Sequence, residues 1–105
     1  MQFLAIMKGK PNTSREKMAP LAKQETLEAW AMTKADVMRS LWYIPGAEGP
    51  AGTVALLECT DQLEAEARCK ALPFVVNGVV SLEIIPLGPC TAYEMLFGQE
   101  QATDQ

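Results

Sequence analysis

The sequence of 105 residues contains no histidine. Histidine is the commonest general base near neutral pH, the usual partner of nucleophilic serine and cysteine, and a frequent ligand of zinc and haem. Its absence removes these arrangements, so acid–base chemistry would have to use Glu, Asp, Tyr, Lys or Cys. We therefore expect no bound metal such as zinc and no haem.

Positive charge and long apolar runs are also scarce. Nine Lys and Arg stand against 13 Asp and Glu, which gives a net charge of −4, whereas nucleic acids and anionic membranes both attract basic patches. No run approaches the roughly 18 apolar residues of a membrane span. The start, MQFLAIMKGK, is apolar before it is basic, the reverse of a signal peptide. We expect a cytoplasmic protein that binds neither nucleic acid nor membrane.

Cysteines are present, but their number and spacing match no disulfide, metal-binding or redox pattern. The three cysteines, Cys59, Cys69 and Cys90, are odd in number and have no metal-binding or redox spacing, so we expect free thiols. One modest basic cluster favours a solvated loop over an anion site. Its members are Lys8, Lys10, Arg15 and Lys17.

The most informative stretch is a pair of apolar, β-prone runs around a turn-rich centre. The runs are Val37–Ile44 and Thr53–Leu57, and the centre between them holds three glycines and two prolines. Glycine supplies positive φ and proline cannot donate to a ladder, so the centre turns while the flanks pair. This pattern predicts a β-hairpin with a long, mobile loop.

The segment before the hairpin predicts a strand followed by a helix. Gln2–Lys8 is apolar on both parities, which is typical of a strand inside a sheet. Asn12, Thr13 and Ser14 each offer a cap at the start of a helix, and Thr13 with Glu16 fits a capping box. Because Pro20 costs a hydrogen bond in a helix already running, the helix either starts near Ala19 or kinks at the proline.

The segment after the hairpin predicts a second helix and a fourth strand. Thr60–Ala71 has helical spacing, with Asp61 as its cap and Pro73 after its end. Phe74–Gly78 is expected to be a loop, and Val79–Leu87 a strand.

The order β-α-β-β-α-β predicts an α+β, ferredoxin-like split sheet with both helices on one face. Neither parity of the outer strands is simply polar, so we expect a second sheet from a partner to cover the other face. We predict one domain over residues 1–98, with a tail at about 88–98 that docks on its own subunit or on a partner. Residues 99–105 are expected to be disordered.

Several positions are typical of one enzyme family. They are Arg39-Ser40-Leu41-Trp42, Gly46, Val54, Leu63, Leu72-Pro73 and Pro86-Leu87. The pattern resembles muconolactone isomerase and its relatives from the first strand to about Pro89. The resemblance implies a homodimeric α+β barrel, sometimes assembled into larger rings. It also implies a cofactor-free enzyme that moves a double bond within a small lactone by proton transfer. Ser40 stands where the resemblance predicts a histidine, and the tail differs from the isomerase ending.

Two charges inside apolar strands are the candidate catalytic residues, Arg39 and Glu83. The second and fourth strands form opposite edges of a ferredoxin-like sheet, so these residues should not meet within one subunit. They either form an intersubunit ion pair or protect the edges, or Arg39 anchors a substrate carboxylate while Glu83 transfers a proton.

Four further residues are candidates for substrate binding: Trp42, Tyr43, Glu25 and Ser81. Trp42 and Tyr43 lie on opposite strand faces, and Trp42 is also expected as a core or interface anchor. Glu25 lies on the apolar stripe of the first helix, where it either reaches solvent or projects between helix and sheet. Ser81 shares its strand parity with Glu83.

These observations support three functional hypotheses. In the first, the protein is an isomerase or lyase for a small anionic organic acid or lactone, and a carboxylate with a raised pKa lies inside a closed pocket. In the second, a non-catalytic barrel binds a small ligand in a pocket of aromatics and methionines that has no such carboxylate. In the third, the protein only assembles and has no cavity.

Overall fold

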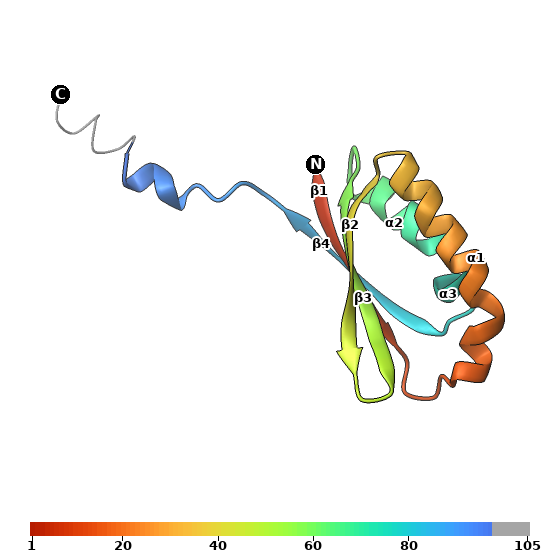
Figure 1. The fold of residues 1–105 in the computed structure, drawn as a ribbon. Coiled ribbons are helices and arrows are strands. Elements are labelled where there is room, and N and C mark those ends of the chain that lie inside the picture. The colour runs from red at the N-terminus through yellow and green to blue at the C-terminus, as the bar shows by residue number, and fades with distance from the viewer. Residues whose placement is uncertain (98–105) are drawn as a thin grey trace, which may run out of the picture.

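A computed structural model describes residues 1–97 and shows a four-stranded antiparallel sheet with helices on one face (Figure 1). The strand order is β2-β3-β1-β4. This arrangement confirms the predicted ferredoxin-like α+β class, with β2 and β4 as opposite edges. The disorder predicted for residues 99–105 concerns positions outside the described residues. No helix within residues 1–97 has both the length and the apolar character needed to cross a membrane.

Strand β1, Gln2–Gly9, lies inside the sheet between β3 and β4, as predicted. Its alternation decides which side chains face the helices. Phe3, Ala5 and Met7 point towards the helices and are buried, whereas Leu4 and Ile6 point away and are partly exposed. The two faces of β1 are therefore not equally buried.

The hairpin differs from its prediction. Strands β2, Met38–Gly46, and β3, Gly49–Glu58, pair up to Gly46 opposite Gly49, so the loop is only the two residues 47–48. The expectation of a long, mobile loop is wrong. Strand β1 pairs with β3 only as far as Gly52, so both strands are edges at the tip, where proline is tolerated. Gly49 has φ +127°, a value that favours glycine in so tight a turn.

Helix α1, Arg15–Lys34, is capped by Ser14, whose Oγ accepts a hydrogen bond from the Lys17 N–H at 3.3 Å. Thr13, the predicted cap, instead donates its hydroxyl to the Val79 carbonyl at 3.1 Å. Pro20 lies within the helix, so the predicted start near Ala19 is wrong. Figure 1 shows α1 changing direction towards its N-terminal end, as a proline that removes one helical hydrogen bond favours.

Helix α2, Gln62–Lys70, begins at the predicted cap, where Asp61 accepts a hydrogen bond from the Glu64 N–H at 2.8 Å. A short helix α3, Pro73–Val76, replaces the loop predicted for Phe74–Gly78. Proline fits the first turn of a helix, where its missing N–H costs nothing. Pro73 therefore begins α3 and also follows the end of α2.

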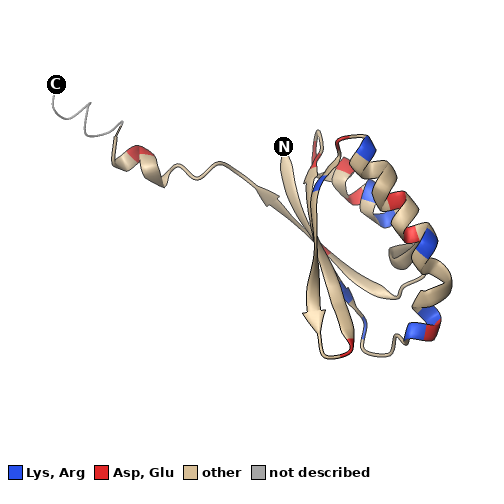
Figure 2. Cartoon of the chain, viewed as in Figure 1, with Lys and Arg blue, Asp and Glu red and all other residues tan. Residues whose placement is uncertain are grey.

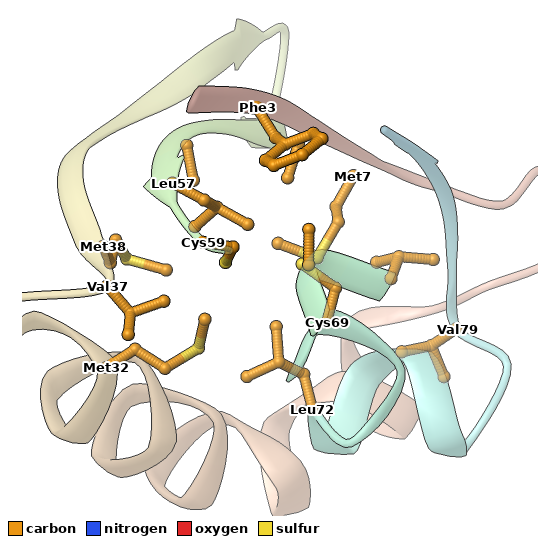
Figure 3. Close-up of a cluster of buried hydrophobic side chains, with 14 residues drawn as sticks. Phe3, Met7, Met32, Val37, Met38, Leu57, Cys59, Cys69, Leu72 and Val79 are labelled. Carbon is orange, nitrogen blue, oxygen red and sulfur yellow. The ribbon is translucent and has the colours of Figure 1, made fainter. Parts of the chain in front are cut away.

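Strand β4, Val80–Leu87, completes the sheet and runs through Pro86, which its edge position allows. The core lies between the sheet and the helices (Figure 3). Phe3, Leu57 and Leu72 are its largest fully buried apolar side chains together with Cys69. Burying each such side chain contributes about 1.5–3 kcal/mol, so this layer holds the helices on the sheet.

The opposite side of the sheet, called the outer face below, has no helix over it (Figure 1). Strand register places eight apolar side chains there: Leu4, Ile6, Trp42, Ile44, Val54, Leu56, Ile85 and Leu87. Trp42 is 54% exposed and Ile85 36%. That a partner's sheet covers the outer face stays a prediction.

Beyond β4 the chain continues as the C-terminal arm, residues 88–97, which points away from the domain (Figure 1). It contains a short 3₁₀ helix, Ala92–Met95. The arm does not lie on its own domain in this structure, and Tyr93 and Phe97 are 69% and 66% exposed. Docking on its own subunit or on a partner stays a prediction.

Candidate functional site

A cavity of about 230 Å³ lies between α1 and the sheet. Its lining is mainly apolar and includes three methionines, Met7, Met18 and Met38, whose flexible side chains adapt to differently shaped ligands. Hydroxyls of Thr53 and Tyr43 add polar groups at the sheet side. The assembly hypothesis predicted no cavity and is therefore disfavoured.

Helical and strand spacing bring these residues to one place. Met18, Glu25 and Ala29 lie at positions i, i+7 and i+11 of α1, which share one helix face. Opposite them, Tyr43 and Thr53 are directly paired across β2 and β3, and both point to the helix side of the sheet. The cavity is therefore built from one helix stripe and one cross-strand pair.

Glu25 is the carboxylate of this cavity. The side chain is half-buried, and its Oε1 accepts a hydrogen bond from the Phe74 N–H at 2.9 Å. Phe74 is the second residue of α3, where the backbone N–H has no partner within the helix. Among the described residues, no second hydrogen bond engages this carboxyl.

Burial raises the pKa of the Glu25 carboxyl, because desolvation disfavours its charged form more than the Phe74 hydrogen bond favours it. The negative charge of Glu28 raises the pKa further. A carboxyl of this kind exchanges protons more readily near neutral pH than an exposed one. Of the two sequence alternatives for Glu25, the structure shows the position between helix and sheet.

Tyr43 also lines the cavity, but at its open side, because the residue is 71% exposed. Trp42 points the other way, onto the outer face, which confirms that the two aromatic residues lie on opposite faces. Ser81 lies on the same outer side of β4 and its Oγ donates to the Lys8 carbonyl at 3.4 Å. The roles proposed for these residues from the sequence stay predictions.

Neither Arg39 nor Glu83 lines the cavity. Arg39 sits in a β-bulge of β2, and its Nε donates to the Asp36 carbonyl at 2.7 Å. Asp36 has φ +59°, so the guanidinium supports a turn in the left-handed region. Glu83 lies opposite Ile6 on the outer side of β4. The two charges are on opposite edges of the sheet, as predicted, and their catalytic roles stay predictions.

The bulge at Arg39 also changes the parity of β2. Met38 faces the helices, and after the bulge Leu41 and Tyr43 do so, while Ser40 and Trp42 face outwards. Strict alternation would place Met38 with Trp42 and therefore on the wrong face. A single sequence carries no clear signal for such a bulge.

Basic residues lie at the hairpin end of the molecule, alongside acidic ones (Figure 2). The guanidinium of Arg15 lies so close to Gly49 at the hairpin tip that a Cβ there would approach it to 2.8 Å. Pro50 and Gly52, which follow this tip, line the cavity. The basic cluster is therefore next to the cavity, a relation that sequence position alone did not indicate.

Other ionisable groups offer no alternative centre. Within residues 1–97, no three His, Cys, Asp or Glu side chains come together as a metal site requires. Cys59 and Cys69 are buried, and desolvation raises the pKa of Cys69 to about 11. That thiol is neutral at physiological pH and a poor nucleophile.

No family model matches this sequence, and no curated protein matches it significantly. A 5-chloro-2-hydroxyhydroquinone dehydrochlorinase from Burkholderia phenoliruptrix, in complex with 2,5-dihydroxybenzoquinone, is similar with a TM-score of 0.74 at 14% identity. The match covers 87% of this chain and 97% of that chain. Muconolactone isomerase is similar with a TM-score of 0.68 at 18% identity, over 88% and 93% of the two chains. An antibiotic biosynthesis monooxygenase has a TM-score of 0.50 at 11% identity, over 85% and 100%. The fold is thus muconolactone isomerase-like, as the sequence predicted.

Proposed function

We propose that this protein binds a small organic anion, an acid or a lactone, in the cavity beneath α1 and moves a proton on it as an isomerase or lyase. The observation that carries the proposal is the half-buried Glu25 carboxyl with its raised pKa inside an apolar cavity. The catalytic hypothesis predicts a carboxylate of this kind in a closed pocket, and this cavity supplies the carboxylate while staying open at Tyr43. A binding-only barrel needs no such carboxyl.

The chemistry requires one group that accepts a proton and returns it. In a double-bond shift, the Glu25 carboxylate takes a proton from a carbon next to a carbonyl group, and the C–H electron pair moves into the conjugated system. The protonated carboxyl then returns the proton to the far end of that system. In the related elimination, the same electron pair expels a leaving group instead. The hydroxyls of Tyr43 and Thr53 line the same cavity and can donate to the developing oxyanion.

The charge distribution supports an anionic ligand. The whole chain has a net charge of −4, yet Lys8, Lys10, Arg15 and Lys17 lie at the end of β1 and the start of α1. Arg15 extends to Gly49 beside the cavity, and a guanidinium recognises carboxylates well. The two enzymes of the same fold support this class of small oxygenated substrate.

A purely structural role for Glu25 is the competing explanation, because its carboxylate satisfies an otherwise unpaired N–H of α3. Glutamine keeps a carbonyl oxygen for this hydrogen bond but cannot transfer a proton. Glu25→Gln therefore separates the two explanations. Glu16→Gln, at an exposed position in the first turn of the same helix and not among the groups that shift the pKa of Glu25, is the matched control.

The test is proton exchange on a small panel that includes muconolactone and 2,5-dihydroxybenzoquinone, followed by NMR in D₂O, with ligand binding measured separately. We expect the wild type and Glu16→Gln to exchange substrate C–H for deuterium. Glu25→Gln should bind similarly but exchange at least roughly 100-fold more slowly. Undiminished exchange in Glu25→Gln, or binding without exchange in the wild type, would contradict the proposal.

The sequence-based assignment is tested in the same assay with Glu83→Gln. Because Glu83 lies on the outer face, away from the cavity, we expect this variant to retain its exchange rate. Loss of exchange in Glu83→Gln with retention in Glu25→Gln would transfer the catalytic role to Glu83.

A further inference from the structure

Glu28 is a second carboxyl close to Glu25 that the proposed proton transfer does not use. The two residues are at positions i and i+3 of α1, where side chains are neighbours on the helix surface with Cβ atoms about 5–6 Å apart. Glu25 lines the cavity, whereas Glu28 is exposed and lines a different space. Helix α1 therefore carries a half-buried and a solvated carboxyl side by side.

The space that Glu28 lines is a groove of about 300 Å³ between α1 and α2. Its other wall is formed by three exposed residues of α2 and its C-cap, Ala67, Arg68 and Ala71. The buried Leu72 lines both this groove and the cavity of Glu25. Because α1 packs on β2 while α2 packs on β1 and β4, the groove lies on the far side of α1 from Tyr43. It therefore approaches Glu25 from the side opposite to the open side of the cavity.

The orientation of Glu28 brings its carboxyl towards Glu25. Helical side chains lean towards the helix N-terminus, which places this carboxyl over the turn that contains residues 24 and 25. The Gln24 amide agrees with this placement, because its Nε2 donates a hydrogen bond to Glu28 Oε1 at 2.9 Å. Within residues 1–97, no hydrogen bond engages the other oxygen, Oε2. The negative charge of Glu28 also raises the pKa of Glu25, as a neighbouring carboxylate should.

A proton that leaves the substrate permanently needs a route from Glu25 to solvent. In an elimination, the C–H electron pair forms the new double bond and the leaving group departs as an anion. The proton then remains on Glu25 and has to be lost before the next turnover. A ligand in the cavity lies between Glu25 and the open side at Tyr43, so it obstructs that exit. The groove offers an exit that a bound ligand leaves free.

We propose that Glu28 relays protons between Glu25 and solvent through the groove between α1 and α2 while a ligand occupies the cavity. The Glu28 carboxylate accepts the proton of the Glu25 carboxyl, directly or through one water molecule, and releases it to solvent. Both carboxyls then return to their starting states. Glu28 does not contact the ligand and acts only through Glu25. The role in turnover rests on the proposed function, whereas the coupling of the two carboxyls does not.

The coupling is tested without ligand by titrating the Glu25 carboxyl with ¹³C NMR in the wild type, Glu28→Gln and Glu16→Gln. Glutamine removes the charge of Glu28 but keeps its size and a hydrogen-bonding oxygen. We expect the pKa of Glu25 to fall in Glu28→Gln and to stay at the wild-type value in Glu16→Gln. The other ionisable groups near Glu25 are Cys69 of α2 and Tyr43 of the cavity, and both remain in all three proteins. An unchanged pKa of Glu25 in Glu28→Gln would overturn the inference.

The turnover test gives muconolactone in D₂O to the same three proteins, and NMR reads the hydrogen isotope at the carbon that receives the proton. A relay replaces the proton on Glu25 by deuterium before it is returned, so the wild type and Glu16→Gln should form deuterated product. Glu28→Gln should return the substrate's own proton and raise the protium fraction at least about threefold at nearly unchanged turnover. A merely structural role of Glu28 would lower turnover without changing this fraction.

Gln24→Met provides an independent variant, because it removes the amide that holds Glu28 and keeps the charge. We expect its protium fraction to lie between those of the wild type and Glu28→Gln.

The outcomes separate this inference from the proposed function. Equal protium fractions in the wild type and Glu28→Gln, at normal turnover, would overturn the relay and leave Glu25 as the group that transfers the proton. A wild type without turnover would contradict the proposed function and, with it, the relay. A Glu25 pKa that responds to Glu28→Gln in that case would still support the coupling of the two carboxyls.

Discussion

Glu25 connects the helix layer to the cavity. Its carboxyl holds the first turn of α3 through Phe74 and at the same time lines the cavity. The cost of desolvating the charged form is reflected in the raised pKa. A residue of this kind influences stability and chemistry together, so each has to be measured separately.

The raised pKa of Glu25 predicts a pH dependence of stability. Between the ordinary carboxyl pKa and the raised value in the fold, the native state binds more protons at Glu25 than the unfolded state does. The free energy of unfolding therefore falls as pH rises through this window and levels off above it. Glu25→Gln lacks the titrating group.

The measurement is urea denaturation of both proteins from pH 4 to pH 8. We expect the stability of the wild type relative to Glu25→Gln to be greatest at the acidic end and to decrease as pH rises. A difference that is constant over the range, or that increases with pH, would show that the carboxyl is not desolvated in solution.

At the residue scale, helical periodicity predicts that Glu25 lies on the apolar stripe of the first helix. Periodicity does not decide whether the side chain reaches solvent or projects towards the sheet. Arg39 and Glu83 are recognisable in the sequence as charges inside apolar strands. Their true surroundings, a bulge for one and an uncovered face for the other, depend on tertiary geometry that a single sequence does not encode locally.

At the scale of elements, Gly52 is the tightest point of the sheet near the cavity. A Cβ at this position would collide with the Met7 carbonyl of the neighbouring strand, which is backbone and cannot move aside. Gly52→Ala should therefore destabilise the protein by about 1–3 kcal/mol and weaken ligand binding, because Gly52 and Met7 both line the cavity. Chemical denaturation measures the first effect and ligand titration the second.

The matched control is Gly88→Ala, at a glycine where a Cβ would meet no atom within 4 Å. We expect this variant to be as stable as the wild type or slightly more so, since alanine restricts the unfolded chain. Equal stability of Gly52→Ala and Gly88→Ala would mean that β1 and β3 are not packed this closely.

Element order was predictable, and the turns were not. The short apolar run Gln2–Lys8, the strand pattern of Val79–Leu87 and the Asp61 cap are strong local signals. The prolines of the hairpin predict the end of pairing, but their effect depends on whether a neighbouring strand needs the missing N–H. That depends on where β1 stops, which is a property of the assembled sheet.

At the scale of the whole molecule, the sequence predicted an apolar face that one chain cannot cover. The signal is the set of apolar residues on both parities of the outer strands. The apolar residues Tyr93–Phe97 of the arm add to it. Sequence alone left open whether the arm docks on its own subunit. In the structure the arm points away from its own domain, so the chain exposes two apolar surfaces.

The predicted homodimer would make thermal stability depend on concentration, because unfolding would then separate two chains. By mass action, a tenfold increase in protein concentration should raise the Tm of the wild type by roughly 2–4 °C. The arm variant, Leu96→Glu/Phe97→Glu, should show a smaller dependence at concentrations where it is monomeric. Differential scanning calorimetry over two decades of concentration measures both. A wild-type Tm that is independent of concentration, with reversible unfolding, would show that the domain is stable as a monomer and that the arm has another role.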